Sequence, residues 1–266
     1  QYFTYIHTEI KNILDEVIAN KWVRHLDPYY ELCTFIVKAQ GDSGLPLYVL
    51  LPKEILALMY LFWCEQDVDK VDDPWGNRSS HIDSEIAWGL SDKRLMLTYF
   101  PASGLQTCIG SMLVCHPQIT LDFIIQFVDK CVQQYAKSKW NGDIVEIVEL
   151  MLPDDTTVTK LGNQTLWNLY RGTSGMSAPH LLECIHMALE GYLLQATKEK
   201  LTEEVRRYLQ TIICHSQSLS LMSIVASLVV AYPDAFFDEA IIMTSNLQFL
   251  KYDLMRYTSE INSNMI

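Results

Sequence analysis

Positive charge is scarce in this sequence. Its 266 residues include 20 Lys and Arg against 32 Asp and Glu, which leaves a formal net charge of −12 at pH 7. Proteins that hold nucleic acid or anionic lipid electrostatically need clustered Lys and Arg to displace counterions. The nearest approaches to a basic patch, Lys198–Lys200 and Arg206–Arg207, are short. We therefore expect no nucleic acid and no membrane among the partners.

Long apolar runs are also missing. The longest, Leu219–Tyr232, is interrupted by Ser220, Ser223 and Ser227, and it falls short of the roughly 20 residues that a transmembrane helix needs. We predict a buried helix at this position. Its serines share one helix face, so we expect a neighbouring helix to pack closely against them.

Short motifs of metal, redox and nucleotide sites are absent. The seven cysteines are scattered, and no Cys-x-x-Cys pair or paired Cys/His spacing indicates zinc or a disulfide framework. Neither a Walker A motif nor Gly-x-Gly-x-x-Gly occurs. We expect a cytoplasmic protein with free thiols, and no metal, cofactor or nucleotide site of its own in this chain.

Helical periodicity is abundant. From Leu181 to Ala196, apolar residues recur three and four apart, which predicts an amphipathic helix that begins near Ser177. Residues 143–151 also fit a helix, with Asp143 and Glu146 as cap and third residue. Similar patterns predict helices over about 3–22, 29–39, 47–64 (divided at Pro52), 105–115, 118–138, 235–245 and 248–260. Pro153–Gly162 is the one place where we expect a short extended segment.

These patterns predict an all-α fold. Helices joined by short turns fit antiparallel pairs stacked as a HEAT- or armadillo-like right-handed solenoid, in which a pair takes about 40 residues. An irregular helical bundle is the alternative, because no crisp sequence repeat is visible. We expect residues 1–266 to form one elongated domain, with the loop-like stretch 65–82 as the candidate subdomain break. The helical pattern begins at Gln1 without Met, so we expect a fragment of a larger protein.

One local feature is a candidate binding site. The segment Arg171-Gly172-Thr173-Ser174-Gly175 stands just before the helix that begins near Ser177. Free backbone N–H groups and the positive end of a helix dipole can hold an anion at such a turn. Arg171, Thr173 and Ser174 are therefore the candidate contacts for an anion or a protein partner. The alternative is an ordinary turn with a solvated arginine.

Two further groupings could bind metal. Glu183 and His186 have the Glu-x-x-His spacing of di-iron bundles, but no second such pair exists, so we interpret them as part of a solvated helix face. His81, Asp83 and Glu85 alternate as metal ligands on a strand would, although acidic residues at a helix start also suit the helix dipole. We predict no catalytic residue and no metal ligand. A metal-dependent hydrolase with a site near the acidic loop 67–85 stays open as the alternative function.

Three segments resemble a known family. LWNLYRG (166–172), HLLECIHMALEGYLL (180–194) and SLSLMSIVASLVVAYPDAF (218–236) resemble a recurrent helical region of very large bacterial ATP-binding proteins of the STAND type, many linked to anti-phage (antiviral) defence. The resemblance covers roughly residues 163–236, and no part of this chain resembles the P-loop. It implies a helical sensor that couples target recognition to an NTPase elsewhere in the parent chain. We therefore expect a non-enzymatic helical repeat scaffold or regulatory module that mediates protein–protein interaction within a larger NTPase.

The position of Arg171 generates a first prediction. It follows an apolar helical turn and precedes a glycine-bracketed loop, so we predict that its guanidinium pairs internally with Asp154, Asp155 or Glu183. Arg171→Ala should then lower the melting temperature of the domain. If the free energy of unfolding instead stays within about 0.5 kcal/mol of the parent, as for an ordinary surface change, the arginine serves a partner.

Overall fold

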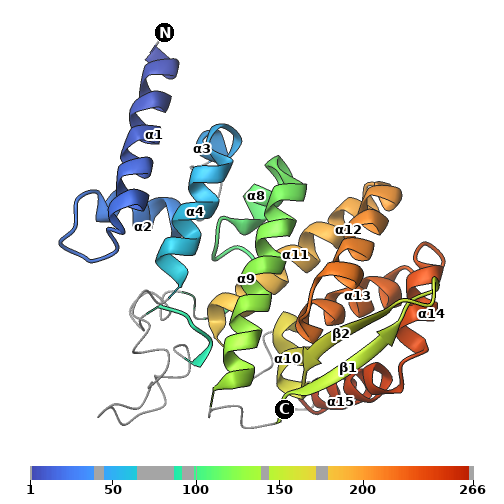
Figure 1. Cartoon of the computed structure of the whole chain (residues 1–266). Helices are drawn as coiled ribbons and strands as arrows, with labels where there is room; N and C mark the ends of the chain where they lie inside the picture. The colour runs from blue at the N-terminus through green and yellow to red at the C-terminus, as the bar shows by residue number, and fades with distance from the viewer. Residues whose placement is uncertain are drawn as a thin grey trace.

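The computed structural model describes residues 2–38, 45–64, 87–91, 99, 101–138, 144–171 and 179–263. Most of these residues are helical, and the sheet among them has two strands (Figure 1). In chain order the elements are α1 (Tyr2–Asn20), α2 (Tyr30–Lys38), α3 (Leu45–Leu50), α4 (Pro52–Trp63), α8 (Ile109–Cys115), α9 (Pro117–Lys137), β1 (Glu146–Met151), β2 (Thr157–Gly162), α10 (Gln164–Asn168), the 3-10 helix η3 (Leu169–Arg171), α11 (His180–Lys198), α12 (Thr202–His215), α13 (Leu219–Ala231), α14 (Phe237–Thr244) and α15 (Leu247–Ser263).

The helices stand side by side in a row (Figure 1). Contacts run along the row from α1 to α4, from α4 to α9, from α9 to α12, and then through α13 and α14 to α15. This arrangement confirms the all-α prediction. A β-hairpin and the short helices α10 and η3 lie between α9 and α11 in the chain, so a strict two-helix repeat does not describe this part. The right-handed solenoid and the single domain stay predictions.

Local sequence signals set several helix starts. Pro52 is the first residue of α4, where a missing N–H costs nothing. The side chain of Asn163 accepts a hydrogen bond from the Leu166 N–H (2.9 Å) and begins α10. In the same way the Ser218 hydroxyl accepts from the Ser220 N–H (3.1 Å) and begins α13. Helix α13 is buried, as the interrupted apolar run predicts.

The predicted helix over 143–151 is wrong, because Glu146–Met151 form strand β1. Val148 and Leu150 are buried, whereas the alternate residues Ile147 and Met151 are exposed. This two-residue period is that of a strand with one covered face. A short apolar run fits either a helix or a strand, so the pattern within 143–151 could not decide between them.

The adjoining turn favours the hairpin. Strand β2 confirms the extended segment expected within 153–162, and it pairs antiparallel with β1 from Glu146↔Gly162 to Met151↔Thr157. Asp155 has a φ of 63°, and the Leu152 N–H donates to the Thr156 carbonyl (2.8 Å). Aspartate tolerates this left-handed conformation better than most residues. The turn therefore brings the two strands into register.

The end of the hairpin is fixed against α13. A Cβ atom at Gly162 would lie 2.2 Å from Cδ2 of Leu219, so only glycine fits this approach. Next to it, the Leu161 N–H donates to the Gln217 carbonyl (2.7 Å). The connection between α12 and α13 thus extends the sheet by one bridge.

Lys160 is a fully buried cation on β2. Its Nζ donates to the Ile213 carbonyl (2.6 Å) and to the Ser216 carbonyl. These carbonyls end α12, where the helix dipole is negative and C=O groups lack helical partners. On α9, Asp129 accepts hydrogen bonds from the Ser216 Oγ (2.8 Å) and the Gln217 N–H (2.8 Å). Ser216 and Gln217, which follow α12, are therefore hydrogen-bonded to Lys160 on β2 and to Asp129 on α9.

The buried lysine predicts a pH dependence. Burial lowers the pKa of Lys160 from 10.5 to about 8, against the attraction of Asp129. Because the folded state loses this proton before the unfolded chain does, the free energy of unfolding should rise between pH 8 and pH 10.5 relative to a Lys160→Met variant. The expected gain at about pH 9.5 is about 2 kcal/mol. Urea unfolding of both proteins at neutral and alkaline pH measures this gain, and a constant difference between them would contradict it.

Candidate interaction surface

The sequence-predicted site lies at the end of η3. Arg171 is the last residue of this 3-10 helix, while its side chain, Thr173 and Ser174 lie outside the described residues. Helix η3 packs against α11, on which Glu183 is buried. The other proposed partners, Asp154 and Asp155, lie in the hairpin turn, at the opposite end of β2 from α10 (Figure 1). Of the three carboxylates, Glu183 thus lies on the helix that contacts η3.

The acidic loop also lies outside the described residues. This applies to the candidate subdomain break at 65–82, to loop 67–85 and to its residues His81, Asp83 and Glu85. Where the structure does describe the chain, no group of three or more His, Cys, Asp or Glu side chains is arranged to hold a metal ion.

Glu183 and His186 are buried, so their interpretation as a solvated face is wrong. The Glu183 carboxylate accepts a hydrogen bond from Nδ1 of His180 (2.8 Å). His186 bonds elsewhere, to the Leu182 carbonyl through Nδ1 (2.6 Å) and to Ser220 through Nε2 (2.8 Å). The Glu-x-x-His spacing therefore does not bring the two side chains to a shared ligand.

His186 is a neutral structural residue. Burial lowers its pKa to about 4. Because a carbonyl can only accept, Nδ1 carries the proton and Nε2 accepts from the Ser220 hydroxyl. Ser218, 2.7 Å away, then donates to Ser220. Both ring nitrogens are occupied, so His186 holds α11 to α13 and is not available as a base.

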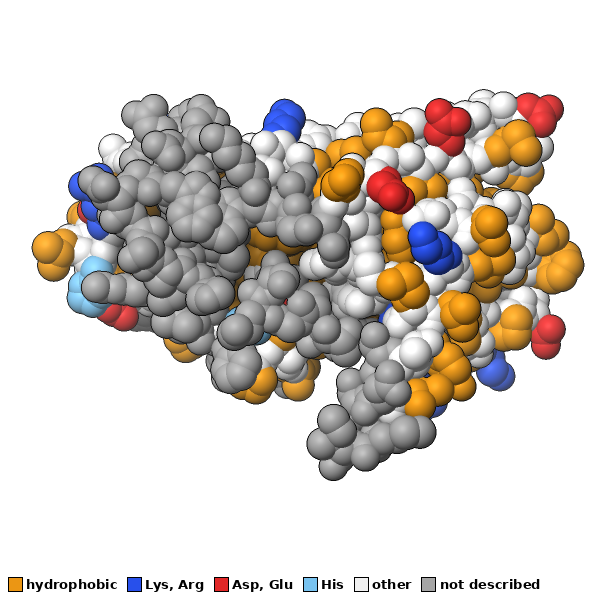
Figure 2. Space-filling view, turned by 90° about the horizontal axis from the view of Figure 1, so that it is seen from below, with side chains coloured by type: hydrophobic (Ala, Val, Ile, Leu, Met, Phe, Trp, Pro, Cys, Tyr) orange, Lys and Arg blue, Asp and Glu red, His pale blue; other side chains and the backbone are white. Residues whose placement is uncertain are grey.

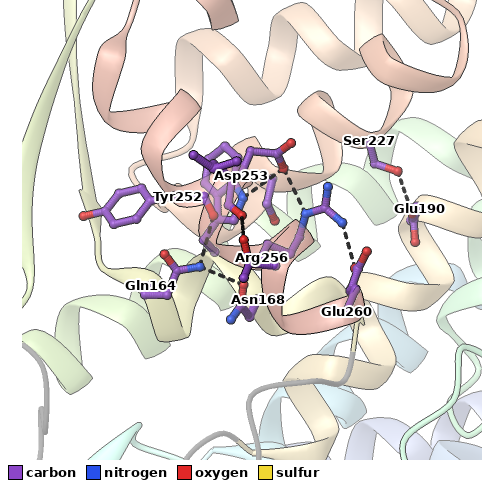
Figure 3. A network of polar contacts seen from close by, with 12 residues as sticks. Gln164, Asn168, Glu190, Ser227, Tyr252, Asp253, Arg256 and Glu260 are labelled. Carbon is purple, nitrogen blue, oxygen red and sulfur yellow. Dashed lines mark hydrogen bonds and ion pairs between the residues drawn. The ribbon is translucent and has the colours of Figure 1, made fainter. Parts of the chain in front are cut away.

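The serine face of α13 lies against α11, as the sequence predicts. Ser223 is fully buried, and its hydroxyl donates to the Ser220 carbonyl (2.6 Å). Ser227 donates to the carboxylate of Glu190 on α11 (Figure 3). The close approach thus includes hydrogen bonds as well as small side chains.

A second polar network holds the buried side of α15 against α10 (Figure 3). The amide of Gln164, on α10, donates to the Tyr252 carbonyl (3.1 Å). Close by, Nε1 of Trp167 donates to the Asp253 carboxylate (3.3 Å). Asp253 also accepts from Nε of Arg256 (2.9 Å). Phe249 and Tyr252 pack beside the Trp167 ring, with centroids 5.6 and 6.0 Å away.

Arg256 connects this network to η3 and to the end of α15. The Nη1 nitrogen of its guanidinium donates to the Glu260 carboxylate (2.7 Å). Its guanidinium carbon lies 5.8 Å from the centre of the Tyr170 ring, a cation–π contact. Arg256 is largely buried and compensates the charge of both Asp253 and Glu260.

Strand β1 holds the start of α15. The Asn246 amide donates to the Glu149 carbonyl (2.9 Å). The carboxylate of Glu146 accepts from the Gln248 amide (3.1 Å) and from the Tyr252 hydroxyl (3.0 Å). Contacts to α10 and β1 together fix the rotation of α15 about its axis.

With this rotation, apolar side chains of α15 point to solvent. Figure 2, which views the molecule from below Figure 1, shows hydrophobic side chains gathered in its right half, the side on which α15 lies in Figure 1. We call five residues the α15 face: Leu247, Leu250, Leu254, Met255 and Tyr257, which are 80%, 45%, 65%, 47% and 56% exposed. Their exposed helical neighbours are Lys251 and Thr258. A surface helix normally carries charged residues on its outer side, so the α15 face is the candidate interaction surface.

The described residues also form hollows away from α15. One, of about 550 Å³, has mostly apolar walls from α1, α4 and α9, such as Ile18, Leu61 and Phe123. Another, of about 250 Å³ between α9 and α12, is lined by Asp122, Asp129 and His215 among others. Asp129 already accepts two hydrogen bonds from the α12–α13 connection, and Asp122 accepts one from Gln118 (2.9 Å). These two carboxylates therefore already have protein donors.

Arg256 offers a test of how α15 is seated. Arg256→Met would leave Asp253 and Glu260 without their cation, so the free energy of unfolding should fall by about 1–3 kcal/mol. The carboxylates are 31% and 30% exposed, which keeps the loss below that of a fully buried pair. Arg256→Lys keeps the positive charge but cannot bond Asp253 and Glu260 through two separate nitrogens. The free energy of unfolding should therefore fall less in the Lys variant than in the Met variant. Urea unfolding measures both, and a Met variant as stable as the parent would contradict this role.

Comparisons with protein-family models and with curated proteins gave no match. All seven cysteines are free thiols, and no helix within the described ranges is long and apolar enough to span a bilayer.

Proposed function

We propose that this chain is a non-enzymatic helical scaffold that binds another polypeptide through the α15 face. The observation that carries the proposal is that α15 is apolar on both sides. On its core side, Phe249 and Tyr252 are buried. On its opposite side, Leu247, Leu250 and Leu254 are exposed. Contiguous exposed apolar patches mark interaction sites, and the α15 face is such a patch on a helix whose opposite side is already packed on the core.

The chemistry of the face favours a protein partner. Full burial of a leucine side chain contributes about 1.5–3 kcal/mol, so covering this face would drive association. Lys251 is its one charged neighbour among the exposed α15 residues, which gives phosphate groups little to bind. A net charge of −12 also repels nucleic acid and anionic lipid.

The resemblance to STAND-type proteins supplies a setting for such a scaffold. In that setting the helical module lies beyond an NTPase core, and occupation of the α15 face by a target or by another domain regulates that core. The setting is the bacterial cytoplasm, whose reducing conditions suit seven free thiols. Catalysis then belongs to other parts of the parent protein.

The test compares the parent domain with a Leu250→Gln, Leu254→Gln double variant, immobilised and exposed to an extract of the native host. Glutamine keeps the net charge and a high helix propensity, so the fold should be retained. Leu105→Gln is the matched control, because Leu105 is 80% exposed and lies before α8. A polypeptide retained by the parent and by the control should then be purified, and its dissociation constant measured against all three proteins.

We expect the double variant to bind the purified polypeptide at least about tenfold more weakly, the equivalent of about 1.4 kcal/mol. Circular dichroism should show unchanged helix content. If the parent retains no polypeptide, or if the double variant binds as tightly as the parent, the proposed function is wrong.

A further inference from the structure

The exposed side of α15 has the spacing of a coiled-coil seam. Leu247, Leu250, Leu254, Tyr257 and Ile261 follow one another at intervals of three, four, three and four residues. This is the a/d pattern by which one helix packs its knobs into the holes of another. Helix α15 has 17 residues and is therefore about 25 Å long. A partner helix of similar length would match it.

The positions beside this seam select the charge of the partner. If Leu247 and Leu254 take a positions and Leu250 takes a d position, then Lys251 takes an e position. Asp253 and Glu260 take the g positions of two successive heptads. Asp253 and Glu260 are already paired with Arg256. The ammonium of Lys251, by contrast, makes no hydrogen bond or ion pair with any residue in the described part of the chain. Lys251 is therefore the charge that a partner helix would meet.

A second copy of this chain does not supply the complementary charge. In an antiparallel pair, e positions face e positions, so Lys251 would face either Lys251 or Thr258 of the other copy, neither of which is a carboxylate. In a parallel pair, g faces e, so Lys251 would face Asn246 and Asp253 would face Thr258. Each copy also carries a net charge of −12, which opposes association at long range.

From the seam and from Lys251, which has no partner among the described residues, we infer that the α15 face binds an amphipathic helix of a different polypeptide, with a leucine-type a/d seam and a carboxylate facing Lys251. This inference rests on the proposed function and specifies the partner. The apolar seam provides the affinity, and the Lys251–carboxylate pair selects among partners and fixes their register.

Synthetic peptides test this partner chemistry. One probe is an 18-residue helical peptide with leucine at its a and d positions and glutamate at its e and g positions, and the other has lysine at those e and g positions. Fluorescence anisotropy at roughly 150 mM salt, where charges are screened beyond about 8 Å, gives the dissociation constant of each peptide. The proteins are the full chain, Lys251→Glu, the Leu250→Gln, Leu254→Gln double variant, and Lys198→Glu. Lys198→Glu is the control, because it makes the same charge change at an exposed residue at the end of α11, away from the α15 face.

We expect the parent and Lys198→Glu to bind the glutamate peptide about twofold to fivefold more tightly than the lysine peptide, as expected for one exposed charge pair. Lys251→Glu should reverse this preference, and the double variant should lose both peptides. Equal binding of the two peptides, a preference that Lys251→Glu leaves unchanged, or no binding of either peptide would overturn the inference. So would a dimer, detected by sedimentation velocity, that the double variant abolishes, because the occupant would then be a second copy.

These outcomes are separable from those of the proposed function. If the peptides fail but the purified host polypeptide still depends on Leu250 and Leu254, the face is an interaction surface and only the coiled-coil partner is wrong. If neither ligand depends on these leucines, the proposed function fails as well.

Discussion

One buried lysine fixes the arrangement of several elements at the centre of this fold. The side chain of Lys160 on β2 is buried, and the last carbonyls of α12 accept its hydrogen bonds in place of water, while the negative charge of Asp129 on α9 attracts it. Removing either side of this arrangement would leave a charge or several carbonyl groups buried without partners, which is costly. The hairpin, the α12–α13 connection and α9 are therefore mutually dependent. The contact of Gly162 with Leu219 adds a steric constraint at the same place.

Much of the helical architecture could be predicted from sequence, because its signals are local. Apolar spacing located α9, α13 and α15, and Pro52 and Ser218 act through their own backbone neighbours. Strand β1 is not predicted because its short apolar run fits two periods and its pairing with β2 depends on residues beyond the next turn. The burial of Glu183 and His186 was missed because the residues that cover and pair with them, such as Ser220, come from elsewhere in the sequence.

The sequence carries a signal of the candidate surface. Apolar residues occupy both sides of the final helix, at Phe249 and Tyr252 as well as at Leu250 and Leu254. Periodicity cannot say which side faces the core, and packing against Trp167 and Glu146 decides it. Lys160 had no comparable signal, since a single lysine in a threonine-rich strand resembles a solvated residue. The internal ion pair of Arg171 remains a prediction, made from the glycine-bracketed segment that follows it in the sequence.

The bond between Trp167 and Asp253 gives the protein a native optical reporter. The Trp167 indole is fully buried on α10, and its N–H points at a carboxylate carried by α15. Indole emission responds to the local electric field, so any displacement of α15 relative to α10 would change the emission wavelength of this side chain. The position of α15 can therefore be followed without attaching a dye, by comparing the spectrum of the parent with that of a Trp167→Phe variant.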